Sequence, residues 1–474
     1  MTTHEVIIVG SGISALAAAR VLKAHRPLLL EARRDRVGGR AHTTFVGDNA
    51  VDLGCSMIHG YNEGNPLKWL SRQLELPPAH VVQSSRTMIV GPNGPLSSDE
   101  TARLLKTSSD KSFKPSQASK APTSNESLAD VTMTLLAGDK YEKELQALAR
   151  LTEIGAGVKL EQISAEWTGF ARPFGGTDGF PDGGYKTILE QLVNEVKDEG
   201  GDVCLGQQVV EVRDDPEARV VEVKTADGTA YTARFVVSTI PLAVLQRRPP
   251  KFVPSLPPAT LAAIARTKVG VLEKALLAYD EAWWPDADTH GQFIILPDDN
   301  IAYQSQEGSL LRQVASTILN VSSFQRIAKQ PHSTLLVYLG AQLGEAVSRF
   351  SKEEVLDTLH EYLCRKLGQG KRETSHLDRS RSTVTTWLTD EFSLGATSSP
   401  VTLQQSSDGV RCSPLDFVTL SRSHFDGRLG FAGEHTSLDH RGSAAGAWVS
   451  GVREGERVLD LLANLRDSAN DAKL

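Results

Sequence analysis

A strand, a glycine-rich turn and a helix at the start of the chain constrain its fold more than any other feature. The apolar, β-branched run at residues 6–9 predicts a buried parallel strand. Residues 13–24 are rich in Ala and Leu at helical spacing, and residues 27–31 predict a second strand. Together these elements predict a βαβ unit, which binds a nucleotide phosphate at its first turn, where the helix N-terminus offers free N–H groups.

The first turn carries the glycine pattern of a dinucleotide site. Gly10 permits a tight turn, Gly12 lets the backbone approach a pyrophosphate, and Ala15 allows the helix to pack closely on the sheet. Glu31 ends the second strand, 19 residues after Gly12, where a carboxylate accepts hydrogen bonds from ribose hydroxyls. In this context the pattern predicts a bound dinucleotide and leaves open whether it is FAD or NAD.

Length, charge and cysteine spacing exclude several classes of protein. The 474 residues are too many for one compact core and predict two intertwined domains. The formal net charge of −7 argues against a nucleic-acid partner, because phosphate binding needs clustered Lys and Arg. The four cysteines form no CxxC pair, and His435 and His440 lack a third ligand, so no metal site or disulfide framework is expected. No apolar run nears the roughly 20 residues of a membrane span, and the early strand leaves no room for a signal peptide.

The rest of the chain predicts strands and helices interrupted by one polar stretch. Residues 96–129 are dominated by Ser, Lys, Thr and Pro and predict an exposed loop, or short helices with a linker. Further helices are expected at residues 140–152, 185–199, 257–267 and 353–367, and strands at residues 209–212, 220–224, 234–239 and 269–279. Residues 428–463 repeat the order of strand, glycine turn and Ala-rich helix, so the nucleotide-binding domain is expected to be discontinuous.

Several separated segments extend the glycine pattern into a family resemblance. Residues 37–43 read Val-Gly-Gly-Arg-Ala-His-Thr, and residues 52–60 read Asp-Leu-Gly-Cys-Ser-Met-Ile-His-Gly. The further matching segments are residues 233–242, 431–436 and 446–455. On these motifs the chain resembles the flavin-containing amine oxidase family, which includes polyamine oxidases, monoamine oxidases and the flavin-dependent histone lysine demethylases. The resemblance covers nearly the whole chain, whereas a generic dinucleotide-binding enzyme would share only the first motif.

The resemblance implies FAD as the cofactor and assigns residues to it. In the family the Gly-Gly-Arg segment lies against the FAD pyrophosphate, so Arg40 would supply the charge there. Glu434 would meet the ribityl chain or pyrophosphate, and the helix beginning near Ser443 would direct its N-terminus at the flavin N1–C2=O edge. The residues assigned to FAD are Gly10, Gly12, Ser14, Ala15, Glu31, Ala32, Arg33, Gly38, Gly39, Arg40, Gly54, Met57, Ile58, Val209, Trp387, Gly433, Glu434, Ser443 and Ala444. Monoamine oxidases attach FAD through a cysteine; none stands at the matching place, and Cys412 is the nearest, so noncovalent FAD is implied.

The matches imply an α/β fold in which a discontinuous Rossmann-type FAD-binding domain holds an inserted α+β substrate domain. The FAD-binding domain is expected at residues 1–75, 200–260 and 415–465. The substrate domain is expected at residues 76–199 and 261–414, and a C-terminal tail at residues 466–474.

Three residues are expected near the flavin or the substrate, each with an ordinary structural alternative. Lys274 lies on an apolar strand, where a lysine is costly unless it is partnered or reaches the surface. The resemblance implies instead that Lys274 holds a water molecule against the flavin N5. Trp387 resembles the family tryptophan beside the flavin and is expected to line the substrate pocket as well, the alternative being a core residue. His59 matches a histidine near the substrate in polyamine oxidases, although a single loop histidine is more often structural.

The chain departs from the family where many members place two aromatic rings around the substrate amine. The two positions fall near Thr397 and Ser443, in segments without an aromatic residue. The cation–π contribution of such a cage is therefore absent or supplied from elsewhere. The departure predicts a wider pocket, lined by Thr397 and Ser443, for a polyamine or another long or bulky amine.

The resemblance implies a flavin-dependent amine oxidase whose partners are a small amine and O2. A hydride would pass from the amine α-carbon to FAD N5, the imine would hydrolyse to an aldehyde, and O2 would be reduced to H2O2. Two alternatives remain open: an L-amino-acid oxidase, for which no carboxylate-binding arginine is evident, and a non-catalytic flavin-bearing module.

The final residues, Ala472-Lys473-Leu474, resemble a peroxisomal C-terminal signal, which predicts a peroxisomal protein, or otherwise a cytoplasmic one.

Overall fold

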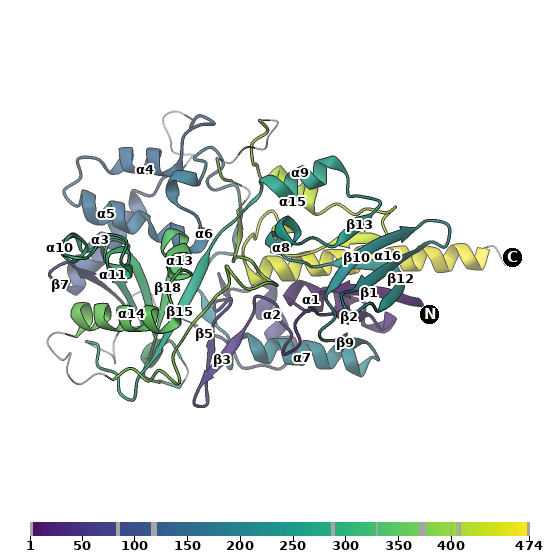
Figure 1. Cartoon of the computed structure of the whole chain (residues 1–474), viewed down its shortest axis with the longest axis horizontal. Coiled ribbons are helices and arrows are strands. Elements are labelled where there is room, and N and C mark those ends of the chain that lie inside the picture. Colours follow the sequence, from purple (N-terminus) through teal and green to yellow (C-terminus); the bar gives the residue numbers. More distant parts are fainter. Residues whose placement is uncertain are drawn as a thin grey trace.

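Two sheets organise the part of the chain that the structure describes. The computed structural model describes residues 3–81, 86–114, 121–285, 290–328, 330–368, 376–399, 401–403, 405 and 409–471. One sheet and its helices lie on the side of the molecule that holds both ends of the chain, and the other sheet lies on the opposite side (Figure 1). The two mixed sheets with their surrounding helices confirm the α/β fold class.

The first sheet joins strands from the beginning, middle and end of the chain. Its strands are β1 (Thr3–Val9), β2 (Leu28–Leu30), β9 (Asp202–Cys204), β10 (Val209–Asp215), β11 (Val220–Thr225), β12 (Ala230–Ser238), β13 (Lys251–Val253) and β21 (Leu429–Phe431). They follow the order β13-β10-β11-β12-β1-β2-β9, and β21 pairs with the C-terminal half of β12. β1 runs parallel to β2 and β12, with Val9 opposite Leu30 and Ser238, so the expected βαβ unit is present.

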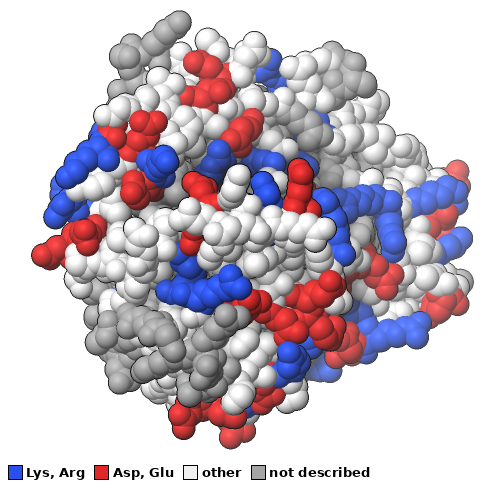
Figure 2. Space-filling model, turned by 60° about the vertical axis from the view of Figure 1, so that its left-hand side comes forward, with Lys and Arg blue, Asp and Glu red and all other residues white. Residues whose placement is uncertain are grey.

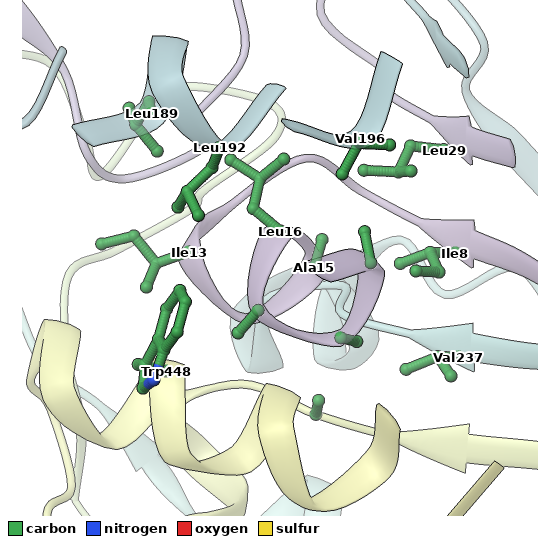
Figure 3. Packing of buried hydrophobic residues seen from close by; sticks show 14 of the residues in the cluster. Ile8, Ile13, Ala15, Leu16, Leu29, Leu189, Leu192, Val196, Val237 and Trp448 are labelled. Carbon is green, nitrogen blue, oxygen red and sulfur yellow. The ribbon is translucent and has the colours of Figure 1, made fainter. Parts of the chain in front are cut away.

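Helices cover both faces of the first sheet, which explains why its parallel strands are apolar throughout. Ile8 belongs to the core that includes α1 (Ile13–Val21), α7 (Gly184–Asp198) and α16 (Ala444–Asp471) (Figure 3). Ile7 points the opposite way because side chains alternate along a strand, and it packs in a second core. The helices that contribute to this second core are α8 (Leu242–Arg247), α9 (Pro258–Arg266) and α15 (Leu415–Leu420).

The second sheet has one face covered by helices and one face turned toward the N-terminal segment. Its order is β19 (Thr383–Val384), β15 (Leu272–Ala278), β18 (Thr334–Gly340), β17 (Leu319–Ser323), β16 (Gln292–Ile295), β6 (Thr87–Gly91) and β7 (Gly94–Pro95). Ala275 and Leu277 pack in a core with α11 (Leu310–Ala315), α13 (Ala341–Val347) and α14 (Lys352–Leu367). Leu276 and Tyr338 pack on the other face with Leu53. Alternation therefore turns Lys274, two residues from Leu276, toward residues 52–56.

The remaining elements are short and connect or flank these sheets. The helices are α2 (Pro66–Gln73), α3 (Ser98–Asp110), α4 (Leu128–Leu136), α5 (Glu142–Ala149), α6 (Leu151–Ala156), α10 (Asp299–Gln304) and α12 (Phe324–Ile327). The strands are β3 (Thr43–Val46), β4 (Asn49–Asp52), β5 (His80–Val81), β8 (Gly179–Phe180), β14 (Lys268–Val269) and β20 (Ser398–Ser399).

Two expected elements are divided in the structure. The helix expected at residues 140–152 is two helices, α5 and α6, which meet at Arg150. The strand expected at residues 269–279 is divided into β14 and β15 at Gly270, whose missing side chain lets Gly157 approach; a Cβ there would lie 2.7 Å from the Gly157 Cα. Within the polar stretch 96–129 the structure has α3, started by a capping box of Ser97 and Glu100.

The division into two domains remains a prediction, and the packing of α7 bears on one of its boundaries. Residues 184–198 are expected in the substrate domain, but Leu189, Leu192 and Val196 share a core with Leu16 of α1 (Figure 3). We therefore propose that α7 belongs with the first sheet, because an amphipathic helix follows the core in which its apolar face is buried.

The close contact between α1 and α16 gives a stability prediction. A Cβ at Gly451 would lie 2.1 Å from the Ser14 carbonyl oxygen, so Gly451→Ala forces the helices apart. We expect unfolding free energy to fall by about 1–3 kcal/mol, despite the better helix propensity of alanine. Gly155→Ala is the matched control, since a Cβ at this helical glycine meets no atom within 4 Å. Urea unfolding of both variants checks this; equal midpoints would contradict the packing argument.

Candidate functional site

A cavity of about 430 Å³ is lined by residues from both sheets and brings the expected site residues together. Except for Ala15 and Ile58, every residue assigned from the sequence to the cofactor, the substrate or catalysis lines it. Ala15 and Ile58 are buried in the core beside α1 instead. The packing role expected for Ala15 agrees with this position, whereas Ile58 acts in the core and through its backbone, which pairs with Gly179.

The glycine turn after β1 forms one end of the cavity. Gly10 has φ +104°, and a Cβ there would lie 2.4 Å from Thr239 Oγ1, so the turn requires glycine. Glu31 is buried and accepts hydrogen bonds from the Ser11 N–H at 2.9 Å and the Arg33 N–H at 2.8 Å. This carboxylate therefore fixes the turn and the strand end relative to each other. A glycine turn at a helix start beside a buried acid suits a dinucleotide.

Arg40 and Glu434 join the two ends of the chain across the cavity wall. Arg40 Nη1 donates to Glu434 Oε1 at 2.9 Å and also to the Ala396 carbonyl. Glu434 further accepts from the Ser398 hydroxyl at 2.8 Å and the Gly442 N–H at 3.1 Å. Burial raises the pKa of Glu434, but the charges of Arg40 and His435 and the hydrogen bonds from Ser398 and Arg40 together outweigh this effect, so the pKa lies below its ordinary value. The carboxylate is therefore ionised and holds Arg40 in place.

Arg33 is also paired within the wall. Its guanidinium donates two hydrogen bonds to Asp390, at 2.8 and 2.6 Å, and lies 5.4 Å from the ring centroid of Phe392. Burial raises the pKa of Asp390, but the hydrogen bonds and charge of Arg33, together with hydrogen bonds from Ser393 and the Phe392 N–H, lower it below its ordinary value. The pair ties the end of β2 to the segment that carries Trp387.

Lys274 is buried and its ammonium group contacts the segment after β4. Nζ donates to the Ser56 hydroxyl at 2.6 Å, to the Asp52 carbonyl at 3.2 Å and to the Gly54 carbonyl. It also lies 5.2 Å from the ring centroid of Tyr338. Burial lowers the pKa of Lys274, although the nearby charge of Asp52 opposes this. The alternative of a lysine reaching the surface is therefore wrong for this residue, whose exposed fraction is 3%.

Trp387 lines the cavity in an orientation fixed by polar contacts. Its ring N–H donates to the Leu53 carbonyl at 3.1 Å, and its backbone N–H donates to Glu273 at 2.9 Å. Glu273 is buried and also accepts from the Leu388 N–H at 2.7 Å. Trp387 thus both borders the cavity and belongs to the packed wall.

The three residues expected near the substrate lie on the same cavity but differ in exposure. The side chain of His59 is 54% exposed, and its Nδ1 lies 2.9 Å from Asp178. Thr397 donates to the Gly155 carbonyl at 3.4 Å. Ser443 accepts from the Gly446 N–H at 3.0 Å and so caps the start of α16.

Sequence reasoning missed the wall supplied by α6 and the second sheet. The cavity residues in this wall are Leu151, Ile154, Leu272, Asn320 and Tyr338. Leu151 and Ile154 lie in α6, and the other three lie in three different strands, so they share no motif and only the fold gathers them. Tyr338 supplies an aromatic ring from a position other than the two at which the family cage was expected.

The four cysteines are free, and one of them borders the cavity. Cys55 lines it, and burial raises the pKa of its thiol to about 12. Cys412 is buried away from the lining residues, with Sγ 4.0 Å from the Ser399 carbonyl oxygen. Among the described residues, no group of three or more His, Cys, Asp or Glu side chains is arranged to hold a metal ion.

Two features of the whole molecule bear on its partners. Acidic and basic side chains are interspersed on the face shown in Figure 2. Within the described ranges, no helix is both long and apolar enough to cross a membrane.

Comparison with known proteins identifies the family. The family model described as flavin containing amine oxidoreductase matches residues 13–459, so the chain belongs to this family of flavin-containing oxidoreductases. The chain is 28% identical to "Polyamine oxidase 4" of Oryza sativa subsp. japonica over 94% of its own length and 87% of the relative. It is 30% identical to "Lysine-specific histone demethylase 1 homolog 2" of Arabidopsis thaliana over 98% of its length, but spans only 60% of that relative. It is 26% identical to "Polyamine oxidase 2" of Arabidopsis thaliana over 97% of its length and 90% of the relative.

Proposed function

We propose that this protein is a FAD-dependent amine oxidase that converts an amine to an imine, and then an aldehyde, with reduction of O2 to H2O2. The buried lysine at the cavity, Lys274, carries this proposal, because a buried ionisable group that borders a cavity and has a shifted pKa is characteristic of a functional site. Flavin-containing polyamine oxidases among the relatives support it. Bound FAD would supply the redox chemistry, and the protein would supply binding, orientation and exclusion of water.

The cavity residues suggest how the chain would hold FAD and substrate. The turn at Gly10–Gly12 would receive the pyrophosphate, with Glu31 next to the ribose and Arg40 as the nearby charge. Trp387 and the start of α16 at Ser443 would border the flavin ring. Lys274 would hold a water molecule between its ammonium group and the ring.

The substrate side of the cavity favours an extended amine over a compact one. Thr397 and Ser443 are small where other family members place aromatic rings, which leaves room beside the flavin position. Leu151, Ile154 and Leu272 add an apolar surface to the cavity wall, which suits a long aliphatic chain. These features support a polyamine, an acylated polyamine or a long-chain amine as substrate.

The amino-acid oxidase alternative needs an arginine for the substrate carboxylate. The arginines that line the cavity are Arg33, Arg40 and Arg248. Each is engaged by a carboxylate of the chain: Asp390, Glu434 and Glu391, respectively. Arg33 and Arg40, the two less exposed of these arginines, are therefore already paired, which supports the amine, whereas Arg248 is more than half exposed and lies 3.6 Å from Glu391.

A broad amine panel tests the proposed function. We expect amine-dependent H2O2 release, with polyamines, acylated polyamines or long-chain amines exceeding benzylamine in kcat/KM. A methylated lysine peptide and L-amino acids belong on the panel, since they represent the competing activities. Benzylamine as the best substrate would contradict the wide pocket, and no peroxide from any amine would contradict the oxidase.

The positions of the cysteines support noncovalent attachment of FAD. Cys412 does not line the cavity, and burial disfavours the thiolate of Cys55. Acid precipitation is therefore expected to release the yellow flavin into the supernatant. Flavin that stays with the pellet would contradict this, and Cys55→Ala would then identify the attachment site.

We propose a peroxisomal location from Ala472-Lys473-Leu474. These three residues lie outside the described part of the chain. A peroxide-producing oxidase is suited to a compartment that destroys peroxide. A fluorescent protein fused to the N-terminus is expected to give punctate peroxisomal signal, which deletion of residues 472–474 makes diffuse. A diffuse signal from the intact fusion would contradict the proposal.

A further inference from the structure

A second cavity shares one buried side chain with the first, that of Ser56. The second cavity measures about 220 Å³, and its wall also includes Asp52 and Ala328. Phe45 and Asp48, which line it as well, are exposed, so the cavity reaches the surface. Ser56 therefore lies between the proposed flavin cavity and a separate route to solvent.

Ser56 differs chemically from the other two hydrogen-bond partners of Lys274. Nζ donates to Ser56 Oγ at 2.6 Å and to the backbone carbonyls of Asp52 and Gly54. An ammonium group has three donors, so the water proposed to lie against the flavin would replace one of the two backbone carbonyls as an acceptor, while Ser56 keeps its contact. A backbone carbonyl only accepts a hydrogen bond, whereas a hydroxyl both accepts and donates one. Among these three partners, Ser56 is thus the one that can take a proton from Lys274 and pass another on.

We propose that Ser56 relays protons between Lys274 and the second cavity, so that Lys274 exchanges protons with solvent while flavin and substrate fill the first cavity. This role rests on the amine oxidase function proposed above. When Lys274 releases a proton, its N–H bond breaks, an O–H bond forms at Ser56, and the proton that Ser56 carried passes to water. The reverse sequence returns a proton, and no electrons move. The second cavity has room for several water molecules.

The other titratable groups around Lys274 fit this direction of transfer. The Asp52 carboxyl lines the second cavity, and burial raises its pKa, so it can receive a proton that Ser56 releases. Cys55 lines the first cavity, and its raised pKa keeps the thiol protonated. The Tyr338 hydroxyl interacts with Ser56, but Tyr338 borders the first cavity and not the second. A path through Tyr338 would lead back to the substrate.

Exchange of the Lys274 Nζ protons with water gives a test that needs no turnover. In flavin-loaded protein labelled with 15N-lysine, the Lys274 resonance is assigned by its loss in Lys274→Met. Ser56→Ala is expected to slow this exchange by about tenfold or more, and Ser56→Thr, which keeps a hydroxyl, is expected to preserve it. Exchange at the wild-type rate in Ser56→Ala would overturn the relay.

Turnover gives a second readout. Ser56→Ala is expected to lower kcat by about tenfold or more with KM unchanged, and to raise the solvent isotope effect on kcat. The variant also removes a hydrogen-bond acceptor that favours the charged form of Lys274, so the pKa of Lys274 falls. The part of the kcat pH profile that reports deprotonation of Lys274 therefore moves to lower pH. Ser56→Thr is expected to restore both. A rate and pH limb equal to those of the wild type would contradict the proposal.

Two further variants separate the relay from damage to the fold. Ser71→Ala removes a buried serine that lines neither cavity, and is expected to change neither exchange nor turnover. Ala328→Phe fills the second cavity without changing a contact of Lys274, and is expected to slow exchange with Ser56 intact. If Ser56→Ala does not fold, Ala328→Phe tests the relay instead. Exchange of the Lys274 Nζ protons at the wild-type rate in Ala328→Phe would refute the relay. If the wild type oxidises no amine, the proposed function is wrong. The exchange rates of the Lys274 Nζ protons still test the relay in that case.

Discussion

The close packing of α1 on α16 is the contact on which the site depends. Small side chains in α1 and Gly451 in α16 bring the two helix backbones together, so the first and last parts of the chain share one core. The turn at Gly10 and the start of α16 at Ala444 consequently line the same cavity. Arg40 and Glu434, 394 residues apart in the sequence, can then form their ion pair. The proposed cofactor wall is thus assembled by helix packing before any ligand contributes.

The buried ammonium group of Lys274 determines the polarity of the cavity wall that the second sheet supplies. The strand β15 turns Lys274 away from the helix-covered core, and three oxygens of residues 52–56 compensate for the lost hydration of its ammonium group. Burial still lowers its pKa, so the cost of the charge is only partly offset. A lysine in this balance changes its protonation more readily than a surface lysine. This property makes the second cavity relevant, because a proton that leaves Lys274 needs a route that substrate does not block.

The sequence predicted those parts of the site whose residues lie close together along the chain. Gly10, Gly12 and Glu31 lie in one βαβ unit, and spacing alone places them at one turn. Lys274 was expected from resemblance, but its partners Asp52, Gly54 and Ser56 could not be derived, since they lie more than 200 residues away. Asn320 and Tyr338 carry no motif, because their role comes from the register of the second sheet, and Leu151 reaches the cavity from α6. The division of the expected strand at Gly270 likewise arises from a tertiary contact with Gly157.

In the proposed reaction an amine reduces flavin in this cavity, and Lys274 takes part. Anaerobic mixing of the flavin-loaded protein with a long-chain amine, followed by flavin absorbance, measures the reductive step directly, and subsequent mixing with O2 measures reoxidation. We expect the amine to lower the flavin absorbance of the wild type. In Lys274→Met we expect slower flavin reduction, slower reoxidation or both, with FAD still bound. Flavin that no amine bleaches, or wild-type rates for Lys274→Met in both steps, would contradict the proposed reaction.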